Sequence, residues 1–126
     1  MKVLVTGASG LLGRSVARTL LARGDAVTVL QRRPSRLPCP EVLGDVADGS
    51  VVRRAAAGQD AVVHLAAKVH VVGGWREFVR ANVDGTRNVV AAARELGVAR
   101  VVHVSSPSVA HAGRALAGVD AEPADP

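Results

Sequence analysis

Three glycines spaced three residues apart follow a short apolar run at the start of the chain. Residues 2–6 (KVLVT) predict a strand, and the string TGASGLLG at 6–13 contains the glycines. Glycine adopts backbone angles closed to other residues and lets a main chain approach a diphosphate closely, while the next helix offers N–H groups and a partial positive charge. The spacing differs from the general G-x-G-x-x-G pattern, and an ordinary glycine-rich turn is the alternative. We predict a dinucleotide site whose residues here are Gly7, Ser9, Gly10, Leu11, Leu12 and Gly13.

Strand and helix patterns alternate along the chain. Apolar runs predict strands at 2–6, 26–30, 41–44, 60–66 and 100–104, and helical patterns predict helices at 11–23, 48–57 and 75–96. Asp48 is the expected N-cap of the second helix, and Gly24, Gly58 and Gly97 are expected to end the three helices. Strands that are apolar on both faces and separated by crossover helices predict a parallel sheet covered on two sides. Right-handed crossovers then predict a Rossmann-type α/β fold with strand order 3-2-1-4-5 and helices on both faces.

Several side chains can be assigned to a face from their spacing. Leu12, Val16 and Leu20 are expected to form the apolar face of the first helix, and Val79, Val83 and Val90 share one face of the long helix. Arg80, Arg87 and Arg94 share another face of that helix, which we interpret as solvated. His64 and His103 lie within strands expected to be buried, and Lys68 is interpreted as a solvated loop lysine.

Composition narrows the class of protein. The 126 residues fit one domain, and 48% hydrophobic residues suffice for a core. The net charge is +5, but the arginines are scattered and only 2% of residues are aromatic, so we expect no nucleic-acid binding. Cys39 is the single cysteine, so neither a disulfide nor a metal site is expected. No leader or long apolar run is present, which predicts a cytoplasmic protein without a membrane segment.

Five local strings occur together in a recognisable order. They are TGASGLLG at 6–13, GDVAD at 44–48, HLAA at 64–67, NVDGTRNVV at 82–90 and VVHVSS at 101–106. Together they resemble the extended short-chain dehydrogenase/reductases, which include NAD-dependent epimerase/dehydratases and 3β-hydroxysteroid dehydrogenases. The resemblance covers essentially the whole chain. The string SSPSVAHAG at 105–113 is more similar to the 3β-hydroxysteroid dehydrogenases than to the sugar-nucleotide epimerases.

The resemblance implies roles for particular residues. Asp45 would accept a hydrogen bond from the adenine amino group, with Val46 beside the ring, although Asp45 could instead be a turn residue. Leu65, Ala66 and Ala67 would end the fourth strand at the edge where the cofactor's ribose fits, or be strand-end packing residues.

The resemblance assigns two further residues to the active site. Asn82 would brace the active-site backbone and reach the nicotinamide ribose, and a polar side chain inside a helix otherwise needs an explanation. Ser106 matches the family's catalytic serine, although a serine after a strand is commonly a turn former.

The residues after the second strand bear on the choice of cofactor. NAD-specific sites usually place an acid there to hold the ribose 2′-hydroxyl, whereas this chain has Gln31 followed by Arg32 and Arg33. A guanidinium can pair with a 2′-phosphate in a bidentate fashion. We therefore favour NADP over NAD, with exposed loop charges as the alternative interpretation.

The family's Tyr-x-x-x-Lys pair is missing from this chain. The tyrosine acts as general acid/base in the family, and these 126 residues contain none. We expect an incomplete NAD(P)-binding domain at 1–106 and an irregular tail at 107–126, truncated after the fifth strand and inactive alone. The parent would be an oxidoreductase acting on a CH–OH or ketone group of a small molecule. The alternatives are a fragment of a nucleotide-sugar epimerase/dehydratase or a non-catalytic NAD(P)-sensing module.

A helix that should cover part of the sheet would also be absent. An apolar patch near the fourth and fifth strands is therefore expected to be exposed, and it predicts self-association or a homodimer.

Overall fold

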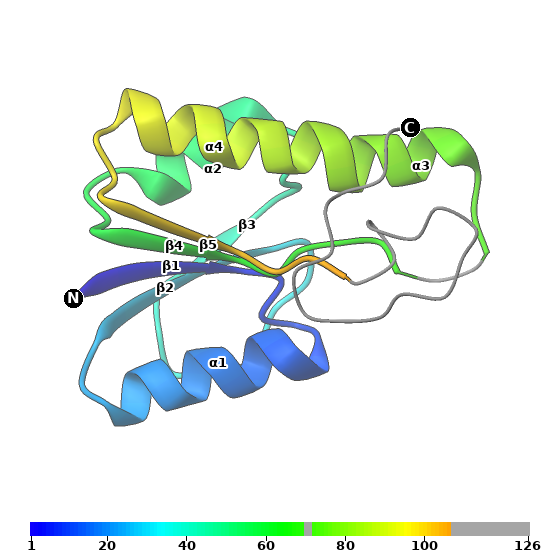
Figure 1. Cartoon of the computed structure of the whole chain (residues 1–126). Helices are drawn as coiled ribbons and strands as arrows, with labels where there is room; N and C mark the ends of the chain where they lie inside the picture. Colours follow the sequence, from blue (N-terminus) through cyan, green and yellow to red (C-terminus); the bar gives the residue numbers. More distant parts are fainter. Residues whose placement is uncertain (70–71, 107–126) are drawn as a thin grey trace, which may run out of the picture.

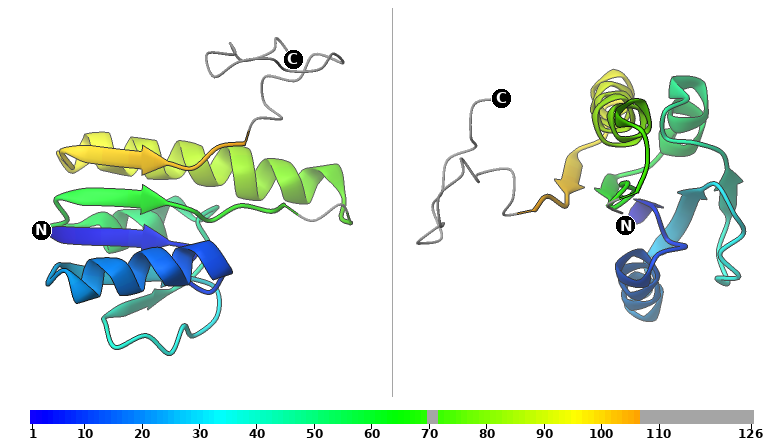
Figure 2. Two further views of the ribbon diagram at one scale, coloured as in Figure 1. Left: turned by 60° about the horizontal axis from the view of Figure 1, so that its bottom comes forward. Right: turned by 90° about the vertical axis from the view of Figure 1, so that its right-hand side faces the viewer.

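A five-stranded parallel sheet separates helix α1 from helices α2 and α4 (Figures 1 and 2). The computed structural model describes residues 1–69 and 72–106. Its strands are β1 Lys2–Thr6, β2 Ala26–Gln31, β3 Glu41–Leu43, β4 Ala61–His64 and β5 Arg100–His103. Its helices are α1 Leu11–Ala22, α2 Gly49–Ala56, α3 Trp75–Phe78, the π-helix η1 Val79–Asp84 and α4 Gly85–Glu95. The strand order β3-β2-β1-β4-β5 confirms the predicted topology, whereas the expected tail at 107–126 lies outside the described residues.

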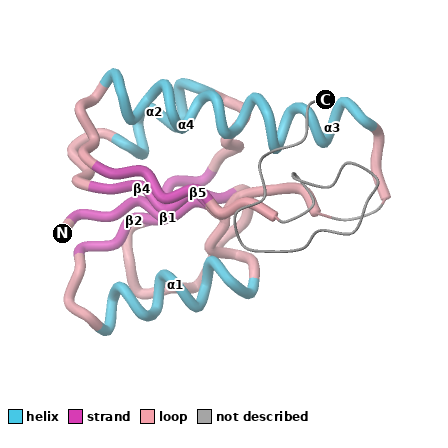
Figure 3. Tube along the Cα trace, viewed as in Figure 1, coloured by secondary structure: helices cyan, strands magenta, loops and turns pink. Residues whose placement is uncertain are grey.

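The two faces of the sheet bury two separate sets of apolar side chains. Val3, Val5, Val27 and Val29 pack on the α1 side together with Ala17. Leu4, Leu30 and Val62 pack on the other side, against α2 and α4. This division follows from the two-residue period of a strand, because neighbouring side chains point to opposite faces. The tube in Figure 3 shows the resulting three layers.

Helix α1 packs on the sheet with part of the face that we expected, because Leu20 contacts the apolar cluster whereas Leu12 does not. Leu12 is 55% exposed, while Gly13 and Ala17 are buried. The reason is the short distance between helix and turn, because a Cβ on Gly13 would lie 2.3 Å from the Gly7 carbonyl oxygen. Small residues therefore make the contact, and the larger Leu12 is rotated outward.

The helix expected over 75–96 contains a π-helical segment, η1, between α3 and α4. The wider turn of a π-helix changes the angular position of the residues that follow it. Val90, which follows η1, is exposed, and Val89, Ala92 and Ala93 are buried instead. Val83 lies within η1 and is also exposed, so two of the three valines of the predicted face do not pack in the core.

Strand β5 is exposed along its whole length, so His103 is not buried as predicted. β5 forms one edge of the sheet, and no helix of the described residues covers it on the α1 side (Figure 2). Val102 is 54% exposed on the α1 side of β5, beside Val63 of β4, while Val101 is exposed on the opposite face and Val104 just after the strand. Part of the apolar patch expected near the fourth and fifth strands is thus exposed, on the α1 side of β5.

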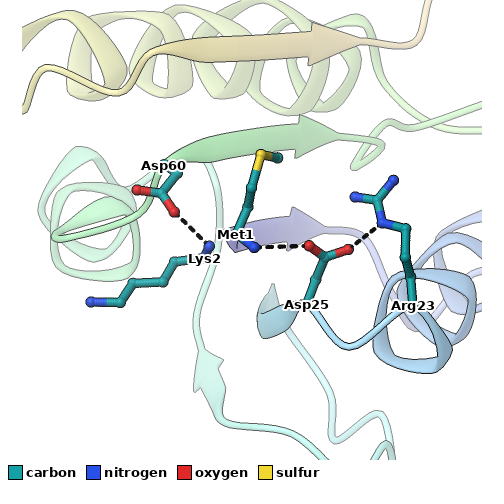
Figure 4. Close-up of polar contacts among 5 residues, drawn as sticks. All are labelled: Met1, Lys2, Arg23, Asp25 and Asp60. Carbon is teal, nitrogen blue, oxygen red and sulfur yellow. Dashed lines mark hydrogen bonds and ion pairs between the residues drawn. The ribbon is translucent and has the colours of Figure 1, made fainter.

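An ion-pair cluster closes the edge of the sheet where the strands begin (Figure 4). The Asp25 side chain is 7% exposed and accepts hydrogen bonds from the Met1 ammonium (2.9 Å) and from Arg23 Nε (2.6 Å). The hydrogen bond from Arg23, followed by that from the Met1 ammonium, lowers the pKa of Asp25. The Lys2 amide donates to Asp60 at 2.7 Å, which ties the starts of β1 and β4 together. These contacts tie the starts of β1, β2 and β4 together, whereas ligands of open α/β sheets bind at the opposite, carboxyl edge.

None of the helices in the described part of the chain combines the length and the hydropathy needed to cross a bilayer.

Candidate functional site

The glycine turn joins β1 to α1 at the carboxyl edge of the sheet (Figure 1). Gly7 has φ +76° and lies against the peptide that follows β4, where a Cβ would be 2.8 Å from the Ala66 nitrogen. The Gly10 amide donates to the Gly7 carbonyl at 3.1 Å. Gly10 is also the N-cap of α1, and no side chain caps that end of the helix. The first-turn amides are therefore available to an anion.

The other residues of the predicted turn lie at the molecular surface. Ser9 and Leu12 are exposed, and Leu11 is 93% exposed. Exposed leucines at the start of a helix do not contribute to the core, so they are free to contact a ligand bound at this edge.

A backbone segment after β4 runs beside the glycine turn. The Leu65 and Ala66 amides each donate to the Thr6 hydroxyl oxygen at 3.1 Å, and Ala67 is exposed. Small side chains and a fixed course keep this segment close to Gly7 without filling the edge of the sheet. Thr6 was not among the predicted site residues, although its place as the last residue of β1 was a signal.

Asn82 holds the next part of the same segment. Its Oδ1 accepts from the Lys68 amide at 2.7 Å, and its Nδ2 donates to the Lys68 carbonyl at 3.0 Å. The Lys68 ammonium pairs at the surface with the exposed Glu77, at 2.5 Å, and lies 5.4 Å from the centre of the Phe78 ring. The π-helix thus braces the backbone at the mouth of the site through Asn82.

Asp45 and Val46 follow β3 and differ in burial, since Asp45 is half-buried and Val46 is buried. Asp45 accepts the Ala47 amide at 3.0 Å and faces Arg80 Nε at 3.7 Å. Val46 is buried in the core, where its carbonyl accepts from Asn88 Nδ2 at 3.0 Å. The Val46 side chain therefore leaves little surface for an adenine ring, whereas the Asp45 carboxylate stays accessible. Arg80 was interpreted only as part of a solvated face, and its pairing with Asp45 brings it to this site.

The loop after β2 is anchored by Glu41. Gln31 Nε2 and the Ser35 amide both donate to Glu41 Oε1, at 2.6 and 2.7 Å. The hydrogen bond from the Ser35 amide is the main cause of the lowered pKa of Glu41. Arg32 and Arg33 are exposed on this anchored loop. Gln31 is directed into the polar cluster, and the two arginines are the cations that a ligand could reach.

Ser106 lies three residues after the end of β5 and is exposed. The rest of the string SSPSVAHAG, from residue 107 onward, lies outside the described residues. Because all five strands are parallel, a residue that follows β5, such as Ser106, lies at the same edge of the sheet as the glycine turn.

His64 links several of these elements. It is 1% exposed, its Nδ1 lies 2.7 Å from the Thr6 hydroxyl, and its Nε2 lies 3.1 Å from the Thr86 hydroxyl. The His103 ring stacks on it with centroids 5.3 Å apart. Burial, and secondarily the charge of His103, lowers the pKa of His64 to about 4. His64 is therefore neutral at physiological pH.

The parallel sheet and the glycine turn at its first strand–helix junction define a Rossmann-type domain. The chain belongs to the NAD dependent epimerase/dehydratase family, which it matches over residues 3–125. This match confirms the resemblance deduced from the five sequence strings.

Relatives and solved structures agree with the family assignment. The chain is 44% identical to a 2-alkyl-3-oxoalkanoate reductase of Stenotrophomonas maltophilia, with 88% of this chain and 35% of the relative covered. It is 39% identical to a 3-beta-hydroxysteroid dehydrogenase of Mycolicibacterium neoaurum, with 94% and 36% covered. A short-chain dehydrogenase/reductase superfamily protein from Agrobacterium tumefaciens, solved with bound NAD, superposes with a TM-score of 0.83 at 36% identity, covering 90% of this chain and 35% of that structure. The chain thus spans about a third of the length of these proteins.

Proposed function

We propose that these residues form the NAD(P)-binding part of an oxidoreductase that acts on a CH–OH or ketone group of a small molecule. The glycine turn carries the proposal, because it places uncapped helix amides at the carboxyl edge of a parallel sheet. Gly7 and Gly13 make close backbone contacts there that a Cβ would obstruct. A diphosphate would bind at the N-terminus of α1.

The rest of the cofactor would extend along the edge in both directions. Asp45 would accept from the adenine amino group, and Leu65, Ala66 and Ala67 would face the ribose on the nicotinamide side. Asn82 would hold the backbone beside that ribose through Lys68. Ser106 would hydrogen-bond the substrate oxygen when hydride moves.

We expect the protein to bind NADP more tightly than NAD. Arg32 and Arg33 are exposed beside the place where the adenosine ribose would lie, and a charge-assisted pair with a 2′-phosphate strengthens binding by about 10- to 100-fold. The double variant Arg32→Ala/Arg33→Ala should bind NADP about 10- to 100-fold more weakly and bind NAD with unchanged affinity. Calorimetric titration with each cofactor measures both effects.

The matched control for this titration is Arg94→Ala, which removes an exposed arginine on α4. It should change neither affinity. Equal affinities for the two cofactors in the wild-type protein would remove the basis for the NADP preference, and no binding of either would refute the proposed function.

The surroundings of the site favour a substrate with an apolar body. Val69 and Val72 are exposed on the segment between β4 and α3, and Trp75 is exposed at the start of α3, which extends past the carboxyl ends of the strands (Figure 1). Apolar side chains gathered beside a ligand edge mark a binding surface. This surface suits a ketone or secondary alcohol on an alkyl or steroid-like body.

Two other functions remain hypotheses. The family's description also covers epimerases and dehydratases, so the parent protein could act on a nucleotide sugar by transient oxidation. Alternatively the chain is a dinucleotide-sensing module, since it contains no tyrosine to act as general acid. Ketone reduction by the purified chain would exclude the sensing module, and we expect none. We propose a cytoplasmic location for the protein.

We also propose that the exposed face of β5 causes self-association of the 126-residue chain. The variant Val102→Lys should shift sedimentation toward the monomer, because it places a charge in the middle of the apolar patch. Val90→Lys, on the exposed side of α4, is the matched control and should sediment like the wild type. A wild-type chain that stays monomeric at high concentration would contradict this proposal.

A further inference from the structure

Three polar groups lie within hydrogen-bond distance of the Thr6 hydroxyl: two backbone amides and one imidazole nitrogen. The Leu65 and Ala66 amides both donate to Thr6 Oγ1. A hydroxyl oxygen has two lone pairs, so these two bonds use its whole accepting capacity. The remaining neighbour is His64 Nδ1, at 2.7 Å. The Thr6 proton must therefore point to His64, which accepts it at Nδ1.

This arrangement determines the tautomer of His64. A neutral imidazole carries its proton on one nitrogen, so an accepting Nδ1 requires the proton on Nε2. Nε2 then donates to the Thr86 hydroxyl, which lies 3.1 Å away in the first turn of α4. The opposite tautomer would direct three donors at Thr6 Oγ1, one more than it can accept.

The position of the segment after β4 matters because it touches the glycine turn. A Cβ on Gly7 would lie 2.8 Å from the Ala66 nitrogen and 2.9 Å from its Cα, so the two backbones are in close contact. A small displacement of Leu65 and Ala66 would alter the shape of the turn. The stacked His103 ring restrains the imidazole from the side of β5.

We propose that His64 is a positioning residue for the cofactor: its Nε2–H tautomer, anchored on Thr86, orients the Thr6 hydroxyl and so holds Leu65 and Ala66 against the glycine turn. This inference rests on the proposed dinucleotide function. It also implies that the Leu65 and Ala66 amides are not donors to the cofactor, because Thr6 already uses them.

The tautomer can be tested without any ligand. In ¹⁵N-labelled protein at neutral pH, NMR should show His64 Nε2 protonated and Nδ1 unprotonated. A proton on Nδ1, or rapid averaging between the two tautomers, would overturn the inference.

A pair of variants at Thr86 tests the positioning role from a residue outside the glycine turn. Thr86→Val has a similar shape but no hydroxyl, whereas Thr86→Ser keeps the hydroxyl. We expect Thr86→Val to speed hydrogen exchange at the Leu65 and Ala66 amides and to weaken cofactor binding about tenfold. Thr86→Ser should behave like the wild type in both measurements.

The outcomes separate positioning from a merely structural role. If Thr86→Val lowers the melting temperature but leaves the exchange rates and the Kd of the folded protein unchanged, His64 does not position this segment. If the wild-type protein binds neither NAD nor NADP, the proposed function fails. The tautomer and the exchange rates then still decide whether His64 holds Leu65 and Ala66.

Discussion

Replacing Gly13 with alanine is expected to destabilise the protein by about 3 kcal/mol or more, and to abolish cofactor binding. A Cβ at this position would lie 2.3 Å from the Gly7 oxygen, 2.7 Å from the Gly7 carbon and 2.9 Å from the Ala8 Cα. All three are backbone atoms, which cannot move aside as a flexible side chain can. The helix would have to separate from the turn, and the amides at its N-terminus would move with it. Urea denaturation measures the decrease in the free energy of unfolding.

Gly10→Ala is the matched control within the same turn. Its φ is −79°, and the nearest atom to an added Cβ is the Gly7 oxygen at 3.5 Å, an ordinary contact. We expect it to cost about 1 kcal/mol, since alanine is a poorer N-cap than glycine. It should nevertheless weaken cofactor binding, because the methyl group would stand between the backbone and the diphosphate. Equal stability of the two variants would contradict the packing role of Gly13.

The second large effect concerns pH. Protonation of His64 is expected to remove about 3 kcal/mol of stability between pH 6.5 and pH 4. The pKa of His64 falls from 6.5 to about 4 on folding, chiefly because the ring is buried. Because the folded-state pKa is the lower one, the unfolded state binds more protons in this window. The protein therefore has its full stability above pH 6.5, and the share that depends on neutral His64 is lost as the pH falls toward 4.

The range between pH 6.5 and pH 5 isolates His64 from the carboxylates. The lowered pKa values of Asp25, Glu41, Asp48 and Glu77 start from ordinary values of 3.8 or 4.5, so these groups lose their contribution at lower pH. Urea denaturation should show a loss of about 2 kcal/mol over this range in the wild type and little in His64→Asn. The same slope in both proteins would assign the pH dependence to another group.

Local sequence signals predicted the elements and their ends well. Asp48 caps α2, accepting from the Ser50 amide at 2.9 Å, and Gly24, Gly58 and Gly97 have positive φ where helices were expected to end. These features depend on a few neighbouring residues, so they can be deduced without knowing the fold. The strand order followed from the same local pattern, because right-handed crossovers leave few topologies.

Contacts between distant residues were less predictable. The apolar face of the long helix was wrong because η1 changes the helical phase, which regular spacing does not reveal. The burial of the Val46 side chain in the core against α4 is one such contact, because no local string indicates it. Asp45 follows β3 and Arg80 lies in η1, and neither residue type predicts that the two side chains pair.

The family, the strand order and the glycine turn could be predicted from the amino-acid sequence, because each depends on short strings whose geometry is local. Which side chains are buried, and how the site is held together, became known from the folded structure. The Thr6, His64 and Thr86 hydrogen bonds join β1, β4 and α4, and they form only when the sheet brings these elements together. The protonation and direction of such a network depend on the neighbours available in space, which order along the chain does not specify.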